Sequence, residues 1–178
     1  MMRAWMVSLL LALIPAAAPA ATTTTKVSVG ESHKLIFTHP STWKSEISGP
    51  AIGPTLRLTP SDSGDFVVLM TAIPPTESSP RSQKDLEALV RQTGQPLLPG
   101  SMQKELALEP ISGKEASGFL FHLTDKNPER GPGDFREARM GAILLNSYVL
   151  SVTILTHSDD KTTVPEVLVM LRSAHYQP

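Results

Sequence analysis

A run of five apolar residues, FVVLM at positions 66–70, constrains the fold of this chain more than any other feature of its sequence. The run is too short for a helix and contains two β-branched valines, which favours a β-strand. Because side chains alternate between the two faces of a sheet, a strand that is apolar at every position is buried on both faces. The run therefore predicts an inner strand of a sheet that has a further layer on each side.

Two segments with helical periodicity can supply those layers. The first runs from Ser82 to Thr93, begins with a Ser-x-x-Asp capping box and has Gly94 placed to end it. The second runs from Val164 to Ser173, behind a similar capping box that starts at Thr163. The residues of the apolar stripes are Leu86, Leu89 and Val90 in the first segment and Val164, Val167, Leu168 and Leu171 in the second. We therefore expect one amphipathic helix against each face of the sheet.

The remaining regular segments have the residue types or the two-residue period of strands. The expected strands cover residues 33–38, 55–59, 104–109, 116–124, 135–145 and 148–156. Asn146 and Ser147 lie between the last two as a tight hairpin turn. The order of elements is several strands, a helix, four antiparallel strands and a terminal helix. This order predicts an α+β protein with an antiparallel β-sheet sandwiched between α-helices.

Four local sequences resemble those of the PsbP-like superfamily. They are a strand running into P-x-x-W (LIFTHPSTW), then PISGKEASGFLFHL, a hairpin ending in SYVLSVTI, and a closing helix, VLVMLRSAHY. The resemblance extends over residues 26–176. It implies a PsbP-like α/β/α sandwich, a fold shared with the yeast Ran-binding nuclear import factor and with small exported bacterial proteins of unassigned function.

The resemblance implies less about function than about fold. Plant members of the superfamily assist the oxygen-evolving complex, and metal-binding or assembly roles go with them. No motif of this chain matches a photosystem-specific one, and one fold can host unrelated activities. The resemblance therefore implies a general accessory character, without a cofactor and without site residues.

The first twenty residues, MMRAWMVSLLLALIPAAAPA, have the three parts of a secretory signal: an arginine, an apolar run at 7–14 and small residues at the end. The apolar run is shorter than the roughly 20 residues of a membrane span, although an uncleaved anchor is an alternative. We expect residues 1–20 to be a cleavable signal peptide, 21–26 a flexible tether and 27–178 a single domain. The expected localisation is the bacterial periplasm, or secretion, with no transmembrane segment after cleavage.

Composition narrows the classes of partner. The chain has no cysteine, so no disulfide can cross-link it and a hydrophobic core alone must stabilise it. Its 16 Lys and Arg nearly balance its 17 Asp and Glu, for a formal net charge of −1. This balance provides no basic surface for nucleic acid or anionic lipid. We expect a monomer that binds no nucleic acid.

The stretch from Thr38 to Glu46, THPSTWKSE, contains two overlapping patterns. Ser41 and Lys44 form the S-x-x-K pair of penicillin-interacting serine hydrolases, in which the amine takes the hydroxyl proton. Pro40 and Trp43 form a P-x-x-W that ends a strand and places an indole ring at the edge of the core. We prefer the structural interpretation, because prolines on both sides leave no room for the helix that the catalytic pair requires. A serine hydrolase using Ser41 and Lys44 is the first alternative.

The loop from Asp125 to Asp134, DKNPERGPGD, suggests a calcium or manganese site. Asp125, Asn127 and Glu129 stand at alternate positions with a glycine behind them, as oxygen ligands do in calcium loops. The loop departs from the EF-hand, because its glycine comes one place late and Arg136 takes the place of the bidentate glutamate. We prefer an exposed hairpin loop. Cation binding through Asp125, Asn127, Glu129 and Asp134 is the second alternative.

No other pattern indicates a catalytic or metal site. The five histidines form no H-x-H or H-x-x-x-H pair. We expect no catalytic residue, no metal and no cofactor, and the sequence does not identify ligand-binding residues. The function predicted is that of an exported, non-enzymatic accessory protein of the periplasm that binds a protein partner or a small apolar ligand. The loops at 46–54 and 125–134 are the predicted contact regions.

Overall fold

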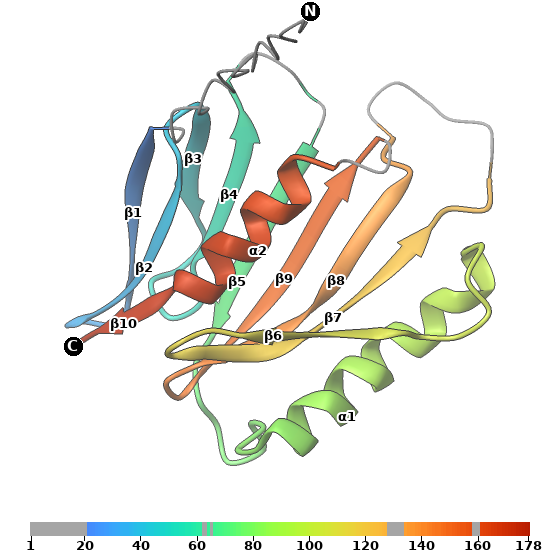
Figure 1. Cartoon of the computed structure of the whole chain (residues 1–178). Helices are drawn as coiled ribbons and strands as arrows, with labels where there is room; N and C mark the ends of the chain where they lie inside the picture. The colour runs from blue at the N-terminus through green and yellow to red at the C-terminus, as the bar shows by residue number, and fades with distance from the viewer. Residues whose placement is uncertain (1–20, 62–63, 65, 128–133, 158–160) are drawn as a thin grey trace, which may run out of the picture.

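The computed structural model describes residues 21–61, 64, 66–127, 134–157 and 161–178 (Figure 1). Within these residues the chain forms ten β-strands, two α-helices and one 3-10 helix, and the strands make two antiparallel sheets. Across the same residues, no helix combines the length and the apolar character that a membrane span requires.

The larger sheet has seven strands in the order β3-β4-β5-β9-β8-β7-β6, and every neighbouring pair is antiparallel. Its strands are β3 (Trp43–Ser48), β4 (Thr55–Pro60), β5 (Phe66–Ile73), β6 (Leu108–Ser112), β7 (Ala116–Thr124), β8 (Glu137–Leu145) and β9 (Tyr148–Thr156). The apolar run at 66–70 lies in β5, between β4 and β9, and four of its five residues are buried. The predicted inner strand is confirmed.

The smaller sheet has the order β1-β2-β10 and consists of β1 (Thr22–Val29), β2 (His33–Pro40) and β10 (His175–Gln177). The prediction of a flexible tether at 21–26 is wrong, because Thr22 to Lys26 pair in register with β2. β-branched threonines favour an extended backbone. The first half of β1 lies at the exposed edge of the small sheet, so its sequence has no alternation of apolar and polar residues. Only its pairing with β2 identifies it as a strand.

Helix α1 (Gln83–Gly94) begins with the predicted capping box. The Ser82 hydroxyl accepts a hydrogen bond from the Asp85 N–H at 3.2 Å, and the Asp85 carboxylate accepts one from the Ser82 N–H at 3.1 Å. Gly94 is the last residue of the helix, and a Cβ there would lie 2.9 Å from the Phe121 ring. A glycine therefore lets the end of α1 approach β7 closely.

Helix α2 (Thr163–Ser173) matches the second predicted helix, with Thr162 rather than Thr163 as its N-cap. The 3-10 helix η1 (Gln95–Gly100) directly follows α1 and was not predicted. The strand predicted at 104–109 is displaced, because β6 begins only at Leu108. β7 and β9 have the predicted bounds.

The β8–β9 hairpin turns at Asn146-Ser147, as predicted. The two strands pair up to Leu145 and Tyr148, which leaves a loop of two residues. Asn146 has a φ of 55°, in the left-handed region that asparagine tolerates better than most residues.

Trp43 has the predicted core position. It is the first residue of β3, is 7% exposed, and its ring centroid lies 4.9 Å from that of Phe66. The strand that it starts was not predicted, since only Trp43 of the six β3 residues is buried. An exposed edge strand has no apolar alternation to reveal it.

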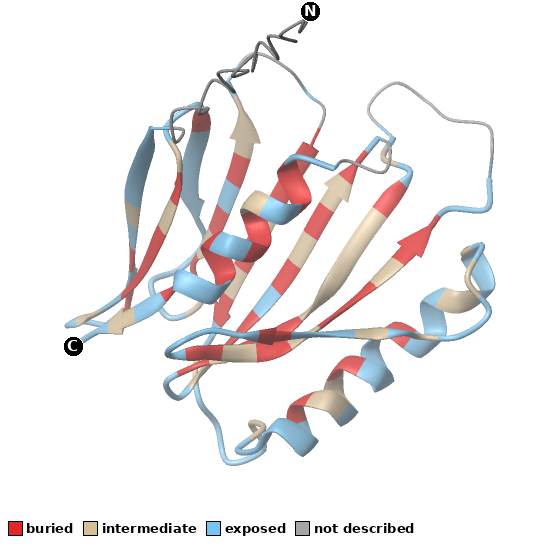
Figure 2. Cartoon of the chain, in the orientation of Figure 1, coloured by how far each residue is buried: buried red, intermediate tan, exposed pale blue. Residues whose placement is uncertain are grey.

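The two helices cover opposite faces of the seven-stranded sheet (Figures 1 and 2). The α2 face carries α2 together with the three-stranded sheet, and side chains of all three form one large core with the central strands. The α1 face has a smaller core, in which α1 packs on β7, β8 and β9. The predicted α+β sandwich is confirmed, although the second sheet beside α2 was not foreseen.

Candidate functional site

A groove of about 520 Å³ lies between the small sheet and α2. Its lining residues are Thr22, Thr38, His39 and Pro40 from β1 and β2, and Pro165, Glu166, Val169 and Ser173 from α2. Among these described residues Glu166 is the only carboxylate, and none is a lysine or an arginine. The surface therefore offers mainly methyl groups and proline rings to a ligand.

Local structure explains why these side chains face outward. On β2, Leu35 and Phe37 point into the core, so the alternate residues Thr38 and Pro40 lie on the outer face of the small sheet. On α2, the buried stripe occupies one side of the helix, and Pro165 and Val169 lie one turn apart on the other. Val169 is 63% exposed, so its methyl groups are accessible from the groove.

His39 forms a fixed part of the groove wall. Its Nδ1 lies 3.0 Å from the carbonyl oxygen of Pro40, which can only accept, so Nδ1 carries a hydrogen. The other ring nitrogen lies 2.9 Å from the Thr25 hydroxyl, and the imidazole stacks near Trp43 with centroids 6.2 Å apart. His39 is 1% exposed and both of its nitrogens are hydrogen-bonded, which gives it a structural role.

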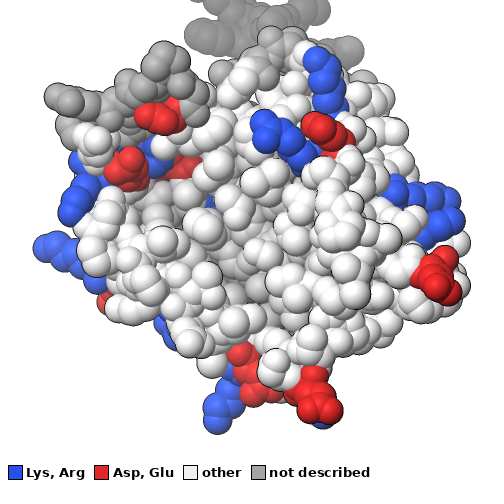
Figure 3. All heavy atoms as spheres, turned by 180° about the vertical axis from the view of Figure 1, so that it is seen from behind, with Lys and Arg blue, Asp and Glu red and all other residues white. Residues whose placement is uncertain are grey.

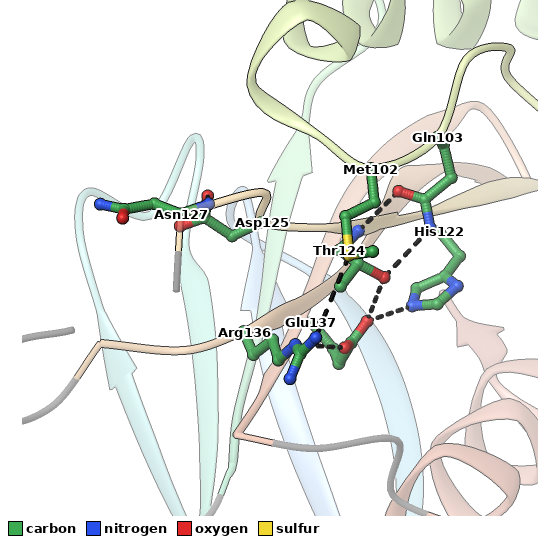
Figure 4. Close-up of polar contacts among 8 residues, drawn as sticks. All are labelled: Met102, Gln103, His122, Thr124, Asp125, Asn127, Arg136 and Glu137. Atoms are coloured by element: carbon green, nitrogen blue, oxygen red, sulfur yellow. Dashed lines mark hydrogen bonds and ion pairs between the residues drawn. The ribbon is translucent and has the colours of Figure 1, made fainter. Parts of the chain in front are cut away.

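A polar cluster lies elsewhere on the α2 face, where β7 ends and β8 begins (Figure 4). The carboxylate of Glu137, which is 7% exposed, accepts from the Thr124 hydroxyl and contacts His122 Nε2, both at 2.7 Å. Its second oxygen is 3.6 Å from Arg136 Nε. Gln103 closes the cluster by accepting from the Thr124 N–H at 2.8 Å. These bonds satisfy a buried carboxylate and hold the ends of two strands together.

The cluster provides two groups of the kind that hold metals, the imidazole of His122 and the carboxylate of Glu137. Most protein metal sites use three or four such ligands. In the part of the chain that the structure describes, no group of three or more His, Asp or Glu side chains could hold a metal ion.

The loop suggested as a cation site begins beside this cluster. Asp125 bridges to Ser101, and its carboxylate accepts from the Asn127 N–H at 2.8 Å, which is a local turn interaction. Asp134 is exposed, and Glu129 lies outside the described residues. The cation hypothesis for this loop stays a prediction.

The S-x-x-K pair lies at the turn between β2 and β3. Ser41 is exposed, and its N–H donates to the carbonyl of Ala21 at 2.9 Å. The Lys44 ammonium donates to the carbonyl of Ser61 at 2.8 Å. A catalytic lysine has to accept the proton of the serine hydroxyl. The arrangement of Lys44 gives no support to that role.

The α1 face also has an exposed surface, because α1 covers only one half of it. Figure 3 looks onto this face and shows charged side chains near the rim around a hollowed, uncharged middle. A cavity of about 160 Å³ opens there beneath α1, and Leu89, Met140 and Thr153 are among its lining residues. Ile73 at its edge is 42% exposed. This cavity is about a third of the volume of the groove on α2.

The predicted contact loop at 46–54 joins β3 to β4. Residues 46–48 belong to β3, and the loop exposes Ile52, which is 67% accessible. The groove residues on α2 were missed in the sequence. Their signal is weak: Pro165 and Val169 are two apolar residues one turn apart, opposite the buried stripe of the same helix.

Comparison with known proteins gives one informative result. No family model matches the chain, and no curated protein matches it. Among solved structures, it is similar to the solution structure of cyanobacterial PsbP (CyanoP) from Synechocystis sp. PCC 6803, with a TM-score of 0.52 and 12% identity. The match covers 94% of this chain and 98% of that chain. At this identity the likeness shows the fold alone.

The topology and this match together define the class of protein. It is an α+β protein in which an antiparallel sheet lies between helical layers. More specifically, the chain has a PsbP-like fold, as its sequence resemblance implied.

Proposed function

We propose that this protein is an exported, non-enzymatic accessory protein that binds a small apolar ligand or a protein partner in the groove between β2 and α2. The observation that supports this function is the groove itself. Its volume of about 520 Å³ lies within the roughly 300–1,000 Å³ of small-molecule sites, which are mostly apolar with a few polar groups.

The composition of the groove supports an apolar rather than a charged ligand. Val169 and Pro165 present apolar atoms on one wall, and Thr38 and Pro40 do so on the other. Glu166 and Ser173 provide the polar groups that would orient a bound molecule. Displacing water from such a surface is favourable by about 25 cal/mol per Å² of apolar area.

Export is proposed from the sequence of residues 1–20, which has the charged, apolar and small-residue regions of a secretory signal. The composition is compatible with an oxidising compartment, because a chain without cysteine cannot form wrong disulfides there. The proposed location is the periplasm.

The function is tested by capture of ligands with a matched pair of variants. Tagged protein is incubated with an extract of the exported fraction of its own cells, and bound proteins and small molecules are identified by mass spectrometry. Val169→Glu places a charge in the groove, whereas Leu97→Glu places one on η1, at an exposed residue that is not among those lining the groove. We expect a ligand that is retained by the wild type and Leu97→Glu and lost from Val169→Glu.

Two results would contradict the proposal. One is a ligand that Val169→Glu retains as well as the wild type does, which would place binding elsewhere. The other is the absence of any bound molecule together with no binding of N-phenyl-1-naphthylamine, an uncharged fluorescent probe for apolar sites, to the protein. A probe that binds the wild type and Leu97→Glu but not Val169→Glu supports the groove directly.

A further inference from the structure

The edge strands of the two described sheets are not equally protected against pairing with a further strand. An unpaired edge exposes a row of backbone N–H and C=O groups to which another chain can bind. The middle residue of β6 is Pro110, which has no N–H. On β10, the N–H of Tyr176 already donates to the Glu115 carboxylate at 3.0 Å. Two of the six residues of β3, Lys44 and Glu46, are charged.

Strand β1 is the exception. It has eight residues, contains no proline, has one charged side chain, Lys26, and pairs with β2 without a bulge from Thr22 to Val29. It forms the outer edge of the small sheet, on the side away from α2 (Figure 1). In the described part of the chain, β1 is therefore the longest and least protected sheet edge.

The register shows which backbone groups of β1 point outward. The N–H and C=O of one residue in an antiparallel strand face the same neighbour, and alternate residues face opposite sides. The Ala21 carbonyl accepts from the Ser41 N–H at 2.9 Å, so Ala21 faces β2 and every second residue after it does the same. Among the described residues, no backbone hydrogen bond engages the outward groups of β1, which belong to Thr22, Thr24, Lys26 and Ser28.

One hydrogen bond at this edge already has the form that strand addition would take. Gly30, the next residue in the same alternation, donates its N–H to the carbonyl of Ala51 at 3.1 Å. Ala51 belongs to the β3–β4 loop, which therefore closes the edge at the end of β1. The outward groups from Thr22 to Ser28 are left for a strand from outside the described chain.

The large sheet provides an apolar surface beneath that position. Ile47 of β3 pairs with Leu56 of β4, so both side chains lie on the α2 face. Leu56 is fully buried, whereas Ile47 is 48% exposed, so the layer above the sheet ends between β4 and this part of β3. A strand added beside β1 would extend that layer over Ile47. Ile52, in the same loop as Ala51, is exposed as well.

Charge indicates the kind of strand that fits. The three strands of the small sheet contain no aspartate or glutamate, and they carry two lysines, Lys26 and Lys34. Lys26 is one of the four outward residues, so the side chain directly opposite it on an added strand would be its nearest cross-strand neighbour. An acidic residue at that position would be attracted, and a basic one would be repelled.

We infer that β1 is a docking edge for an extended segment of a partner protein, which pairs antiparallel with Thr22 to Ser28. The segment has apolar side chains at the alternate positions that face Ile47 and an acidic side chain opposite Lys26. Backbone hydrogen bonds give affinity in this mode of recognition, and the alternate side chains give specificity. The inference does not rest on the groove between β2 and α2.

A designed peptide provides the test. Its sequence is Thr-Val-Glu-Val-Thr-Val-Thr with both ends blocked, which in antiparallel pairing places its glutamate opposite Lys26 and its valines on the side of Ile47. The control is the same peptide N-methylated at the glutamate and at the middle threonine, the amides that would donate to Lys26 and Thr24. Fluorescence anisotropy of labelled peptides measures binding. We expect methylation to weaken binding by about tenfold or more, because two backbone hydrogen bonds are lost.

Variants of the protein test the register. We expect Lys26→Glu to weaken binding of the peptide by about threefold, and to favour a peptide with lysine in place of its glutamate by a similar factor. Lys84→Glu, at an exposed position of α1, is the matched control and should change neither. Thr24→Pro removes an outward N–H that β2 does not use, so we expect it to abolish binding while the circular dichroism spectrum stays unchanged.

Three results would overturn the inference. The first is no binding at about 1 mM peptide, or equal binding of the methylated peptide. The second is loss of binding in Val169→Glu, which would place the peptide in the groove instead. The third is a dimer in sedimentation velocity that Thr24→Pro converts to a monomer, since a second copy would then occupy the edge. Binding that methylation and Lys26→Glu weaken, and Val169→Glu does not, supports the docking edge even if the groove binds no ligand.

Discussion

The two faces of the seven-stranded sheet are covered in different ways. The α2 face is closed by a helix and by a second sheet, and their side chains merge into one core that reaches from β3 to β6. The α1 face is closed by one helix of 12 residues over β7 and β8, and its core is much smaller. Among the described residues, no helix lies over the half of that face formed by β3, β4 and β5 (Figure 1).

The two faces also differ in the number of polar side chains that they bury. The residues of the described chain that are both polar and buried are His39, Thr124, Glu137, Thr156 and Thr163, and each lies on the α2 side of the large sheet. Burying such groups requires hydrogen-bond partners, which a thick layer with two sheets can supply. The α2 face therefore contains the larger share of the core, whereas the α1 face leaves more of the sheet surface accessible.

The largest expected effect comes from replacing one phenylalanine on each face of the sheet. Phe37→Ala on the α2 face removes a ring that is 1% exposed between the two sheets, and we expect it to destabilise the protein by about 3–5 kcal/mol. Phe119→Ala on the α1 face removes a ring that is only partly buried, and we expect about half that loss. Urea unfolding followed by circular dichroism measures both. Equal losses would show that the two faces contribute alike.

The polar cluster provides a second comparison. Glu137→Gln replaces a carboxylate that accepts from Thr124 and contacts His122, and we expect a loss of about 1–3 kcal/mol because a buried partner is left poorly satisfied. Glu109→Gln, on exposed β6, is the matched control and should leave the unfolding free energy unchanged. The measurement is again urea unfolding. A stable Glu137→Gln protein would mean that the cluster does not hold β7 and β8 together.

Gly113 tests how closely the β6–β7 turn packs against α2. A Cβ at Gly113, in the β6–β7 turn, would lie 2.0 Å from the carbonyl oxygen of Arg172 at the end of α2. Because the obstacle is backbone, we expect Gly113→Ala to displace the turn from α2 and to cost about 1–3 kcal/mol. Gly100→Ala, where a Cβ meets nothing within 4 Å, is the control and should be nearly neutral. Thermal unfolding distinguishes the two, and equal midpoints would contradict the close packing.

The smallest effect concerns the start of α1. The Ser82 hydroxyl, followed by the Arg81 N–H, lowers the pKa of Asp85 from its ordinary 3.8. A lowered pKa in the folded state means that this interaction stabilises the protein above pH 3.8 and is lost as the pH falls through the folded value. We expect Ser82→Ala to raise the pKa of Asp85 toward 3.8, as measured by NMR titration. Ser45→Ala on exposed β3 serves as control, and an unchanged Asp85 pKa in Ser82→Ala would contradict the capping box.

The sequence by itself determined the elements whose signals are local. The capping box of α1, the Asn146 turn and the alternating strand β9 all depend on residues within a few positions of one another. The inner position of the run at 66–70 also followed from its composition, but only Phe66, Val68 and Met70 belong to a core, which lies on the α2 face.

Only the tertiary structure decided the features that join distant segments. β1 is a strand because β2 pairs with it, and the groove exists because α2 lies against the end of the same β2, more than 120 residues later in the chain. Neither wall of the groove has a recognisable sequence pattern. Its threonines, its prolines and Val169 are the outward-facing residues of strands and a helix whose periodic apolar residues face the core. A binding surface of this kind is defined by the packing of two elements, which no local periodicity encodes.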